Sequence, residues 1–127
     1  MDLGAYGKLS IQQVFEKSSN VGVSKLIWKY FKANPQHFIN YLDEFGLTQP
    51  VEFQMAGAAQ PYIKSPADPS WSASSLPWMS IGYELTISPL HTLTFYNAIA
   101  NKGRMVQPII VTEESYANKT LKTFRPK

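Results

Sequence analysis

Residues 10–33, SIQQVFEKSSNVGVSKLIWKYFKA, contain two helix signals on either side of a short polar step. Ser10 followed by Gln13 is a capping-box pattern, and the apolar stripe after it predicts a helix of about two turns. From residue 21 to residue 33 the apolar side chains again recur with a helical period, which predicts a second helix. The step Ser18-Ser19-Asn20 therefore lies at the start of a helix.

The polar step has two interpretations. Polar side chains two positions apart at a helix junction can point into one cleft, where a hydroxyl such as that of Ser18 could relay a proton and a carboxamide such as that of Asn20 could hold an amide. Serine and asparagine are also common helix caps, so Ser19 or Asn20 is the expected N-cap. On local evidence alone, capping is the simpler interpretation.

Two further helices start with the same signal. Asn34-Pro35 and Ser88-Pro89 each place a capping side chain before a proline at the first helical position. Apolar residues with helical spacing follow both pairs, and Gly46 and Gly103 end the two patterns. The sequence thus predicts four helices.

The remaining segments favour loop and strand. Residues 47–79 carry five prolines among many serines and alanines, which predicts a long irregular loop. Residues 105–124 contain an apolar, β-branched run at 105–112, a polar turn and an alternating run at 120–124, which predicts an edge β-hairpin. The expected fold class is α+β and mainly helical, in a single partial domain over residues 1–127.

Composition excludes several classes of site. The 127 residues are 44% hydrophobic, enough for one core, and contain no cysteine, which excludes disulfides, thiolate catalysis and cysteine zinc sites. No glycine-rich phosphate loop and no His-Glu-x-x-His motif occurs, so we expect no cofactor and no metal. No apolar run reaches the ~20 residues of a transmembrane helix, and no targeting segment opens the chain.

The charged residues give no functional signal of their own. The net charge is +3, and the densest basic cluster is Lys119, Lys122, Arg125 and Lys127. No aromatic residues interleave with this cluster to stack bases, so a solvated edge is favoured over a nucleic-acid site. His37 and His91 have no obvious carboxylate or nucleophile beside them in the sequence and are interpreted as structural.

A second match in the sequence favours the interpretation of the polar step as part of a site. The segments Ser80-Ile81-Gly82-Tyr83, Ser88-Pro89-Leu90 and 98–103 (AIANKG) follow Lys17–Gly22 and Phe45-Gly46-Leu47 in one order. This combination resembles the transpeptidase domain of class B penicillin-binding proteins, the septal and elongation enzymes that cross-link peptidoglycan. The resemblance covers about residues 10 to 112.

Some family features differ or are absent. Glu84, Ser88 and Lys102 stand where most members have glycine, threonine and glycine. No serine is followed three residues later by lysine, so the nucleophile motif Ser-x-x-Lys is missing. Lys122-Thr123-Phe124 is similar to the family's Lys-Thr-Gly, but it comes too early and carries phenylalanine, so we interpret it as an edge strand.

The resemblance implies roles for the polar step. In the family, a lysine-activated serine attacks the penultimate D-Ala carbonyl of a stem peptide and forms an acyl-enzyme, and β-lactams acylate the same serine. Carried over, Ser18 would relay a proton near the lysine and Asn20 would hydrogen-bond the acyl-chain amide. Ser19 would point away and cap the helix.

The first hypothesis is that the chain is a fragment of the helical lobe of a D,D-transpeptidase, with a penicillin-binding/β-lactamase-like fold that lacks its central sheet. An unassisted serine is a poor nucleophile, so this chain alone is predicted to be inactive. The partners implied for the complete parent are peptidoglycan stem peptides, β-lactams and cell-division or elongation proteins, with no nucleic acid. The implied location is the bacterial cell envelope, on the periplasmic side of the inner membrane.

The second hypothesis is a stand-alone helical module without enzymatic activity. It would bind a protein or peptide through an aromatic face on the second and third helices, formed by Tyr30, Phe31, Phe38 and Tyr41. Aromatic residues at helical spacing are also ordinary core. A missing sheet would expose apolar surface on the fragment, so self-association is expected under the first hypothesis.

Overall fold

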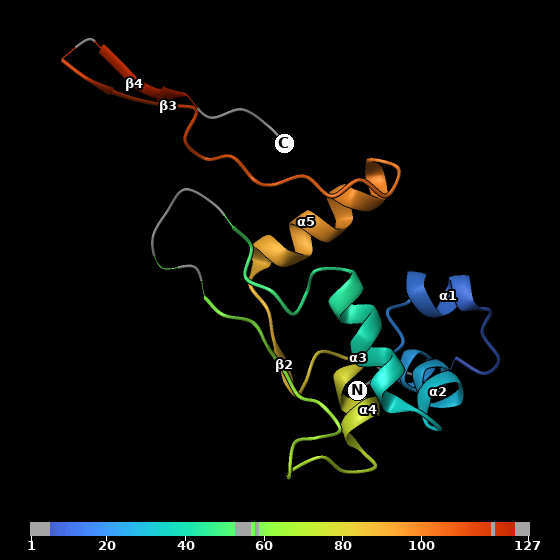
Figure 1. Cartoon of the computed structure of the whole chain (residues 1–127). Helices are drawn as coiled ribbons and strands as arrows, with labels where there is room; N and C mark the ends of the chain where they lie inside the picture. Colours follow the sequence, from blue (N-terminus) through green and yellow to red (C-terminus); the bar gives the residue numbers. More distant parts are fainter. Residues whose placement is uncertain (1–5, 53–56, 58, 118, 124–127) are drawn as a thin grey trace. The chain divides into compact units, whose positions relative to one another are not determined.

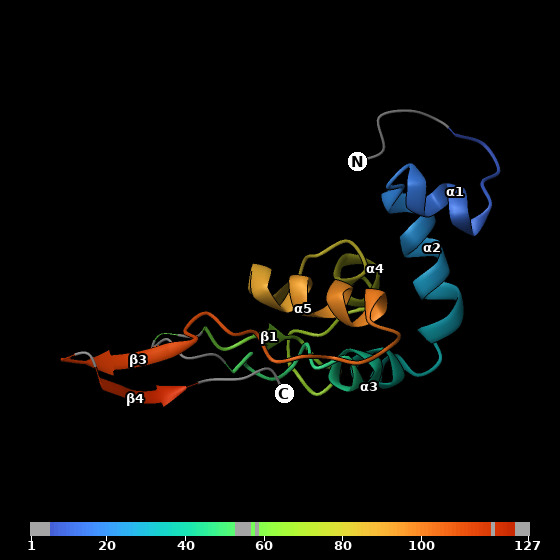
Figure 2. The ribbon, with the colours of Figure 1, turned by 90° about the horizontal axis from the view of Figure 1, so that it is seen from above.

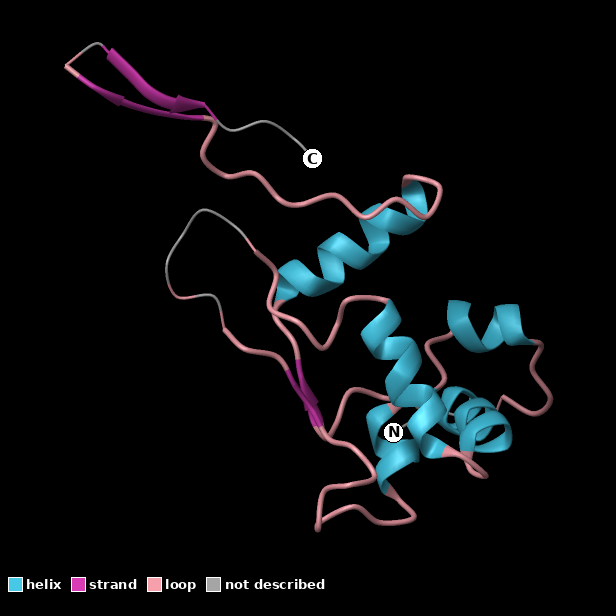
Figure 3. Cartoon of the chain, in the orientation of Figure 1, coloured by secondary structure: helices cyan, strands magenta, loops and turns pink. Residues whose placement is uncertain are grey.

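The structure is a computed structural model that describes residues 6–52, 57, 59–117 and 119–123. The chain divides into two compact units, one formed by Met1–Leu42 with Tyr62–Thr86 and the other by Asp43–Pro61 with Ile87–Lys127. Figure 1 labels the helices and β2, β3 and β4, and Figure 2 also labels β1. Most of the described regular structure is helical, and the strands are short (Figure 3). The α+β, mainly helical prediction agrees with this content.

The first unit begins with two helices whose starts follow the sequence signals. α1 (Ile11–Glu16) has the predicted capping box: the Gln13 N–H donates to Ser10 Oγ (3.2 Å) and the Ser10 N–H donates to Gln13 Oε1 (2.9 Å). α2 (Asn20–Phe31) follows after a tight turn. Figure 2 shows α1 beside the N-terminal end of α2, where Val14 lies against Gly22.

α3 (Pro35–Glu44) starts at the predicted proline. The Phe31 ring near the end of α2 lies 5.5 Å from the Phe38 ring and 5.9 Å from the Tyr41 ring, between ring centroids. These edge-on contacts join α2 to α3. Much of the predicted aromatic face is therefore used for packing within the unit.

The rest of the first unit is a short ladder and one further helix. β1 (Tyr62–Ile63) pairs antiparallel with β2 (Leu85–Thr86), with Tyr62 opposite Thr86 and Ile63 opposite Leu85. α4 (Ser75–Met79) lies between the two strands in sequence and packs against α2. Leu76 and Met79 of α4 are almost completely buried, so the core of this unit lies beneath α4.

The second unit contains α5 (Pro89–Ala100), β3 (Glu113–Tyr116) and β4 (Lys119–Thr123). β3 and β4 form an antiparallel hairpin with a register shift between Glu114 and Ser115. The Phe45 and Phe95 rings pack edge to face with centroids 5.2 Å apart. Among the described residues the strands thus form two separate two-stranded sheets.

The predicted number of helices was wrong, because the described residues form five. The additional helix, α4, lies inside the segment 47–79 that was predicted to be an irregular loop. Pro77 is tolerated there because the first N–H groups of a helix need no partner within the helix. A helix of one turn is too short to show a period, and the burial of Leu76 and Met79 stabilises it.

The first strand of the predicted hairpin was also wrong. Residues 105–112 form no strand, and β3 begins at Glu113. Pro108 cannot donate to a ladder, and strands joined by a short connection pair next to their turn. The predicted second strand overlaps β4, which includes Lys122 and Thr123, while Phe124 lies outside the described residues.

Gly22 allows α1 and α2 to approach closely, and Gly22→Ala tests this contact. An added Cβ would lie 2.7 Å from both γ-carbons of buried Val14. Because valine is stiff at χ1, we expect the variant to lose about 1–3 kcal/mol of unfolding free energy, although alanine is the better helix former. Thermal unfolding followed by circular dichroism measures the change.

The double variant Val14→Ala/Gly22→Ala is the control, because removing the γ-carbons makes room for the new Cβ. It should be more stable than the sum of the two single effects indicates. A single Gly22→Ala variant that unfolds at a higher temperature than the wild type would contradict the close contact.

Candidate functional site

The polar step between α1 and α2 has an unusual backbone. Ser18 is exposed and adopts φ +50°, a left-handed conformation that few residues other than glycine adopt. Its N–H donates to the Phe15 carbonyl at 3.0 Å and ends α1. This residue turns the chain from one helix into the next, so the start of α2 is set by the turn.

Ser19 is the N-cap of α2. Its side chain is buried, its Oγ accepts from the Gly22 N–H at 3.1 Å, and its own N–H donates to the Val14 carbonyl at 3.0 Å. The prediction that the middle residue of the step caps the helix is confirmed.

Asn20 is the first residue of α2 and lines a groove of about 610 Å³. The other lining residues come from α2 and from α4 with the turn after it: Val21, Ser24, Lys25, Trp28, Pro77, Trp78, Ile81 and Tyr83. Of the two predicted site residues, Asn20 lines this groove, and Ser18 lies on the turn before α2. A side-chain amide at the edge of an apolar groove is suited to orient a ligand that contains peptide bonds.

The two stretches singled out from the sequence meet at this groove. Ser24 Oγ, one turn after Asn20, lies 3.1 Å from Ser80 Oγ and 3.3 Å from the Pro77 carbonyl, and its single proton can be donated to either oxygen. Ser80 Oγ also donates to the Pro77 carbonyl at 2.6 Å. Ser24 was not singled out from the sequence. The available signal was its place on the same helix face as Asn20, one turn further along.

Two aromatic rings form one wall of the groove. Trp78 and Tyr83 pack edge to face with their centroids 5.1 Å apart, and the two side chains are 47% and 60% exposed. The Tyr83 N–H donates to the Trp78 carbonyl at 3.0 Å, which fixes the turn that carries both rings. Large exposed aromatic surface beside polar groups is typical of a binding site.

An ion pair follows this wall in the chain. Lys64 Nζ is 3.1 Å from Glu84 Oε1, and Glu84 follows Tyr83 in the chain. A hydrogen bond from Ser75 and the nearby Lys64 ammonium hold the pKa of Glu84 below its ordinary value. Hydrogen bonds from Ser70 likewise lower the pKa of Asp68. Glu84 is therefore a charged carboxylate at neutral pH.

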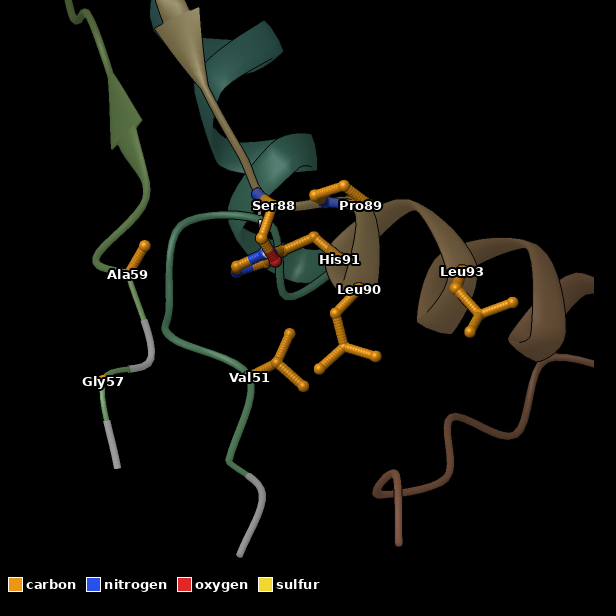
Figure 4. A pocket seen from close by; sticks show the side chains of 8 residues that line it. All are labelled: Val51, Gly57, Ala59, Ser88, Pro89, Leu90, His91 and Leu93. Atoms are coloured by element: carbon orange, nitrogen blue, oxygen red, sulfur yellow. Dashed lines mark hydrogen bonds between the residues drawn. The ribbon is translucent and has the colours of Figure 1, made fainter. Parts of the chain in front are cut away.

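His91 lies in the second unit, beside a different pocket of about 520 Å³ (Figure 4). Its Nε2 is 2.8 Å from the Gln49 carbonyl, to which only a protonated nitrogen can bond, so Nδ1 accepts from Ser88 Oγ at 2.7 Å. His91 also completes a capping box at the start of α5 with Ser88. Its structural interpretation is confirmed, and His37 is exposed on α3.

The described residues show neither a metal cluster nor a membrane-spanning helix. Within residues 6–52, 57, 59–117 and 119–123, no three histidine, cysteine, aspartate or glutamate side chains gather as a metal site would require. None of the helices in that part of the chain has the length and apolar character needed to cross a membrane.

Comparison with known proteins agrees with the two matched stretches. The sequence matches the family described as penicillin binding protein transpeptidase domain over residues 3–126. The peptidoglycan D,D-transpeptidase FtsI of Buchnera aphidicola is 33% identical over 102 residues, which are 80% of this chain and 17% of that protein. The penicillin-binding protein PbpB of Mycolicibacterium smegmatis is 34% identical over 98 residues, 77% of this chain and 14% of that protein.

Solved structures give the same result. Penicillin binding protein 3 from Mycobacterium tuberculosis, complexed with aztreonam, superposes with a TM-score of 0.77 at 28% identity over 99% of this chain and 28% of its own. The transpeptidase domain of penicillin-binding protein 3 from Burkholderia pseudomallei superposes with a TM-score of 0.72 at 27% identity, over 94% and 34%. The chain spans less than a fifth of the length of these sequence relatives and about a third or less of these solved chains. Sequence and fold agree, and the chain belongs to the penicillin-binding protein transpeptidase family.

Proposed function

We propose that this chain forms part of a peptidoglycan D,D-transpeptidase and supplies the substrate-side wall of its active site. In this role Asn20 hydrogen-bonds the amide of the acyl chain and Ser18 relays a proton near the catalytic lysine. Ser19 caps α2. The attacking serine is not among these residues.

One observation supports the proposal above the others. The Ser-x-Asn step and the Ser80–Tyr83 stretch are far apart in sequence, yet Asn20, Ile81 and Tyr83 line the same groove. The bond between Ser24 and Ser80, which are 56 residues apart, joins the two stretches. If the residues of the polar step acted only as helix caps, we would not expect the two family stretches to line the same groove.

The reaction requires groups that this sequence does not contain. A serine hydroxyl becomes a good nucleophile only beside a base, and no Ser-x-x-Lys motif occurs in the 127 residues. Asn20 and Ser18 can orient a substrate and move a proton, but neither can start acyl transfer. We therefore expect activity only where this chain and a lysine-activated serine belong to the same folded domain.

The substrates and setting follow from the relatives. A D,D-transpeptidase acts on peptidoglycan stem peptides, and one of the similar structures is complexed with aztreonam. We extend both ligand classes, stem peptides and β-lactams, to the complete protein. Its place would be the periplasmic side of the bacterial inner membrane, with cell-division or elongation proteins as partners.

The alternative of a stand-alone binding module receives less support. Phe31 is the centre of the proposed aromatic face, and it packs against Phe38 and Tyr41 between α2 and α3. A face that is used for helix packing is a poor docking surface. The open reading frame separates the two functions, because continuation into Ser-x-x-Lys upstream and Lys-Thr-Gly downstream favours the transpeptidase.

Asn20→Ala in the protein encoded by the complete reading frame tests the assigned role. Losing one positioning donor typically costs about 10²-fold or more in rate, so acylation by fluorescent penicillin should slow by that order. Stopped-flow or gel-based labelling measures the acylation rate. An Asn20→Ala protein that acylates like the wild type would show that the wall has been misassigned.

Ser19→Ala is the matched control in the same helix start. Losing an N-cap typically costs about 1 kcal/mol of stability, so the melting temperature should fall. The acylation rate of the folded variant should stay near that of the wild type, because Ser19 faces the interior. Equal loss of acylation in both variants would mean that Asn20 acts only through helix stability.

The 127-residue chain alone should not be labelled covalently by fluorescent penicillin. The sequence offers no serine with a lysine three residues later, so no acyl-enzyme can form at a useful rate. A labelled band that survives denaturing electrophoresis would show that a nucleophile exists within the chain.

Self-association of the isolated chain is a further expectation. Large apolar side chains are more than half exposed on α1 and α5: Ile11, Phe15, Leu93, Tyr96 and Ile99. Exposed apolar surface of this extent favours association between copies. Sedimentation equilibrium should show an average mass that rises with concentration, whereas a constant monomer mass would contradict the expectation.

A further inference from the structure

Lys64 and Glu84 face each other one step beyond the β1–β2 ladder. The Lys64 N–H donates to the Glu84 carbonyl at 3.2 Å, and Lys64 Nζ lies 3.1 Å from Glu84 Oε1. The lysine side chain is 8% exposed and the glutamate side chain 26%. Charges that are removed from water to this degree persist only when they are paired. The two residues are thus joined through both backbone and side chain.

The backbone at Glu84 is left-handed, with φ +56°. Glycine adopts this conformation freely, whereas a residue with a Cβ is strained in it. Lys102 also has φ +56°, but it is exposed and makes no ion pair within the described part of the chain. Ser18 and Ala117 are left-handed as well, and of Glu84 and Lys102, which have the same φ, Glu84 is the one that is paired with a buried side chain.

Residue 84 is connected directly to the aromatic wall of the groove. Tyr83 precedes it, and the N–H groups of Gly82 and Tyr83 donate to the carbonyls of Met79 and Trp78. Trp78 and Tyr83 line the groove together with Asn20. A change in the φ angle of residue 84 would redirect the chain at the base of this wall. The direction of the wall thus depends on the conformation of one strained residue.

Ser75 lies on the α4 side of the carboxylate. It is completely buried at the start of α4, and its hydroxyl lowers the pKa of Glu84. The Ser75 Oγ accepts from the Ser72 N–H at 3.0 Å, and among the described residues Glu84 Oε2 is buried without a hydrogen-bond partner. Glu84 is thus joined by its ion pair to Lys64, the residue after β1, and lies near the start of α4, which carries Trp78. These contacts oppose release of the left-handed turn.

We propose that Lys64 and Glu84 are positioning residues whose ion pair holds the left-handed turn at residue 84 and thereby fixes Trp78 and Tyr83 at the groove beside Asn20. The local constraint stands on the contacts above. The identity of the ligand that the wall meets, a stem peptide or a β-lactam, rests on the proposed function.

Amide hydrogen exchange in the 127-residue chain tests the local constraint. Glu84→Gln and Lys64→Met remove the ion pair, so the Gly82 and Tyr83 amides should exchange on the order of 10-fold faster. The Val23 amide of α2, which bonds to the Ser19 carbonyl, is the internal reference and should not change. Lys64→Arg keeps the charge and should restore slow exchange.

Two glycine variants separate the ion pair from backbone strain. Lys102→Gly relieves strain only and should leave the exchange of Gly82 and Tyr83 unchanged. Glu84→Gly relieves the same strain but removes the ion pair, so it should accelerate both amides. Unchanged exchange in Glu84→Gln and Glu84→Gly, or an equal acceleration of Val23, would overturn the proposal.

Acylation of the complete protein tests the link to the site. In Glu84→Gln the acylation rate at saturating fluorescent penicillin should fall on the order of 10-fold at a temperature where the variant is fully folded, and Lys102→Gly should match the wild type. Faster exchange with unchanged acylation would overturn the positioning role. A wild type that is never acylated would refute the proposed function, and the exchange data would still decide whether the pair holds the turn.

Discussion

The hydrogen bonds between Ser24 of α2 and the Pro77–Ser80 end of α4 are the contact on which the described site depends. Ser80 Oγ bonds to the Pro77 carbonyl, and Ser24 Oγ reaches both groups. Small hydroxyl side chains let two helices approach closely while satisfying a carbonyl that has no helical partner. This contact brings Asn20, one turn before Ser24, to the groove that Tyr83 also lines.

The polar step shows that capping a helix and lining a groove need not compete. Successive residues at a helix start point in different directions, so three neighbours can serve three purposes. Ser18 turns the chain with a left-handed backbone, Ser19 caps from the interior, and Asn20 lines the groove. The local sequence could not choose between a cap and a groove-lining residue because neighbouring residues supply both.

Local chemistry explains which parts of the fold could be predicted. Ser10, Asn34-Pro35 and Ser88-Pro89 mark helix starts through bonds to residues a few positions away, so the sequence carries the whole signal. α4 has no such signal, because a single turn is stabilised by burial against distant residues. The Lys64–Glu84 pair was equally hidden, since it depends on strand pairing between residues separated by α4.

Two of the departures from the family pattern, Glu84 and Lys102, are residues with a left-handed backbone. The family resemblance places glycine at residues 84 and 102, and both have φ +56° here. The side chain at 102 is exposed, so its conformation has little beyond its own turn to support it. At 84 the side chain that causes the strain also forms the buried ion pair that resists its release. The effect of a departure from glycine therefore depends on what the new side chain contacts, and at 84 the contact involves the residue that follows Tyr83 of the groove.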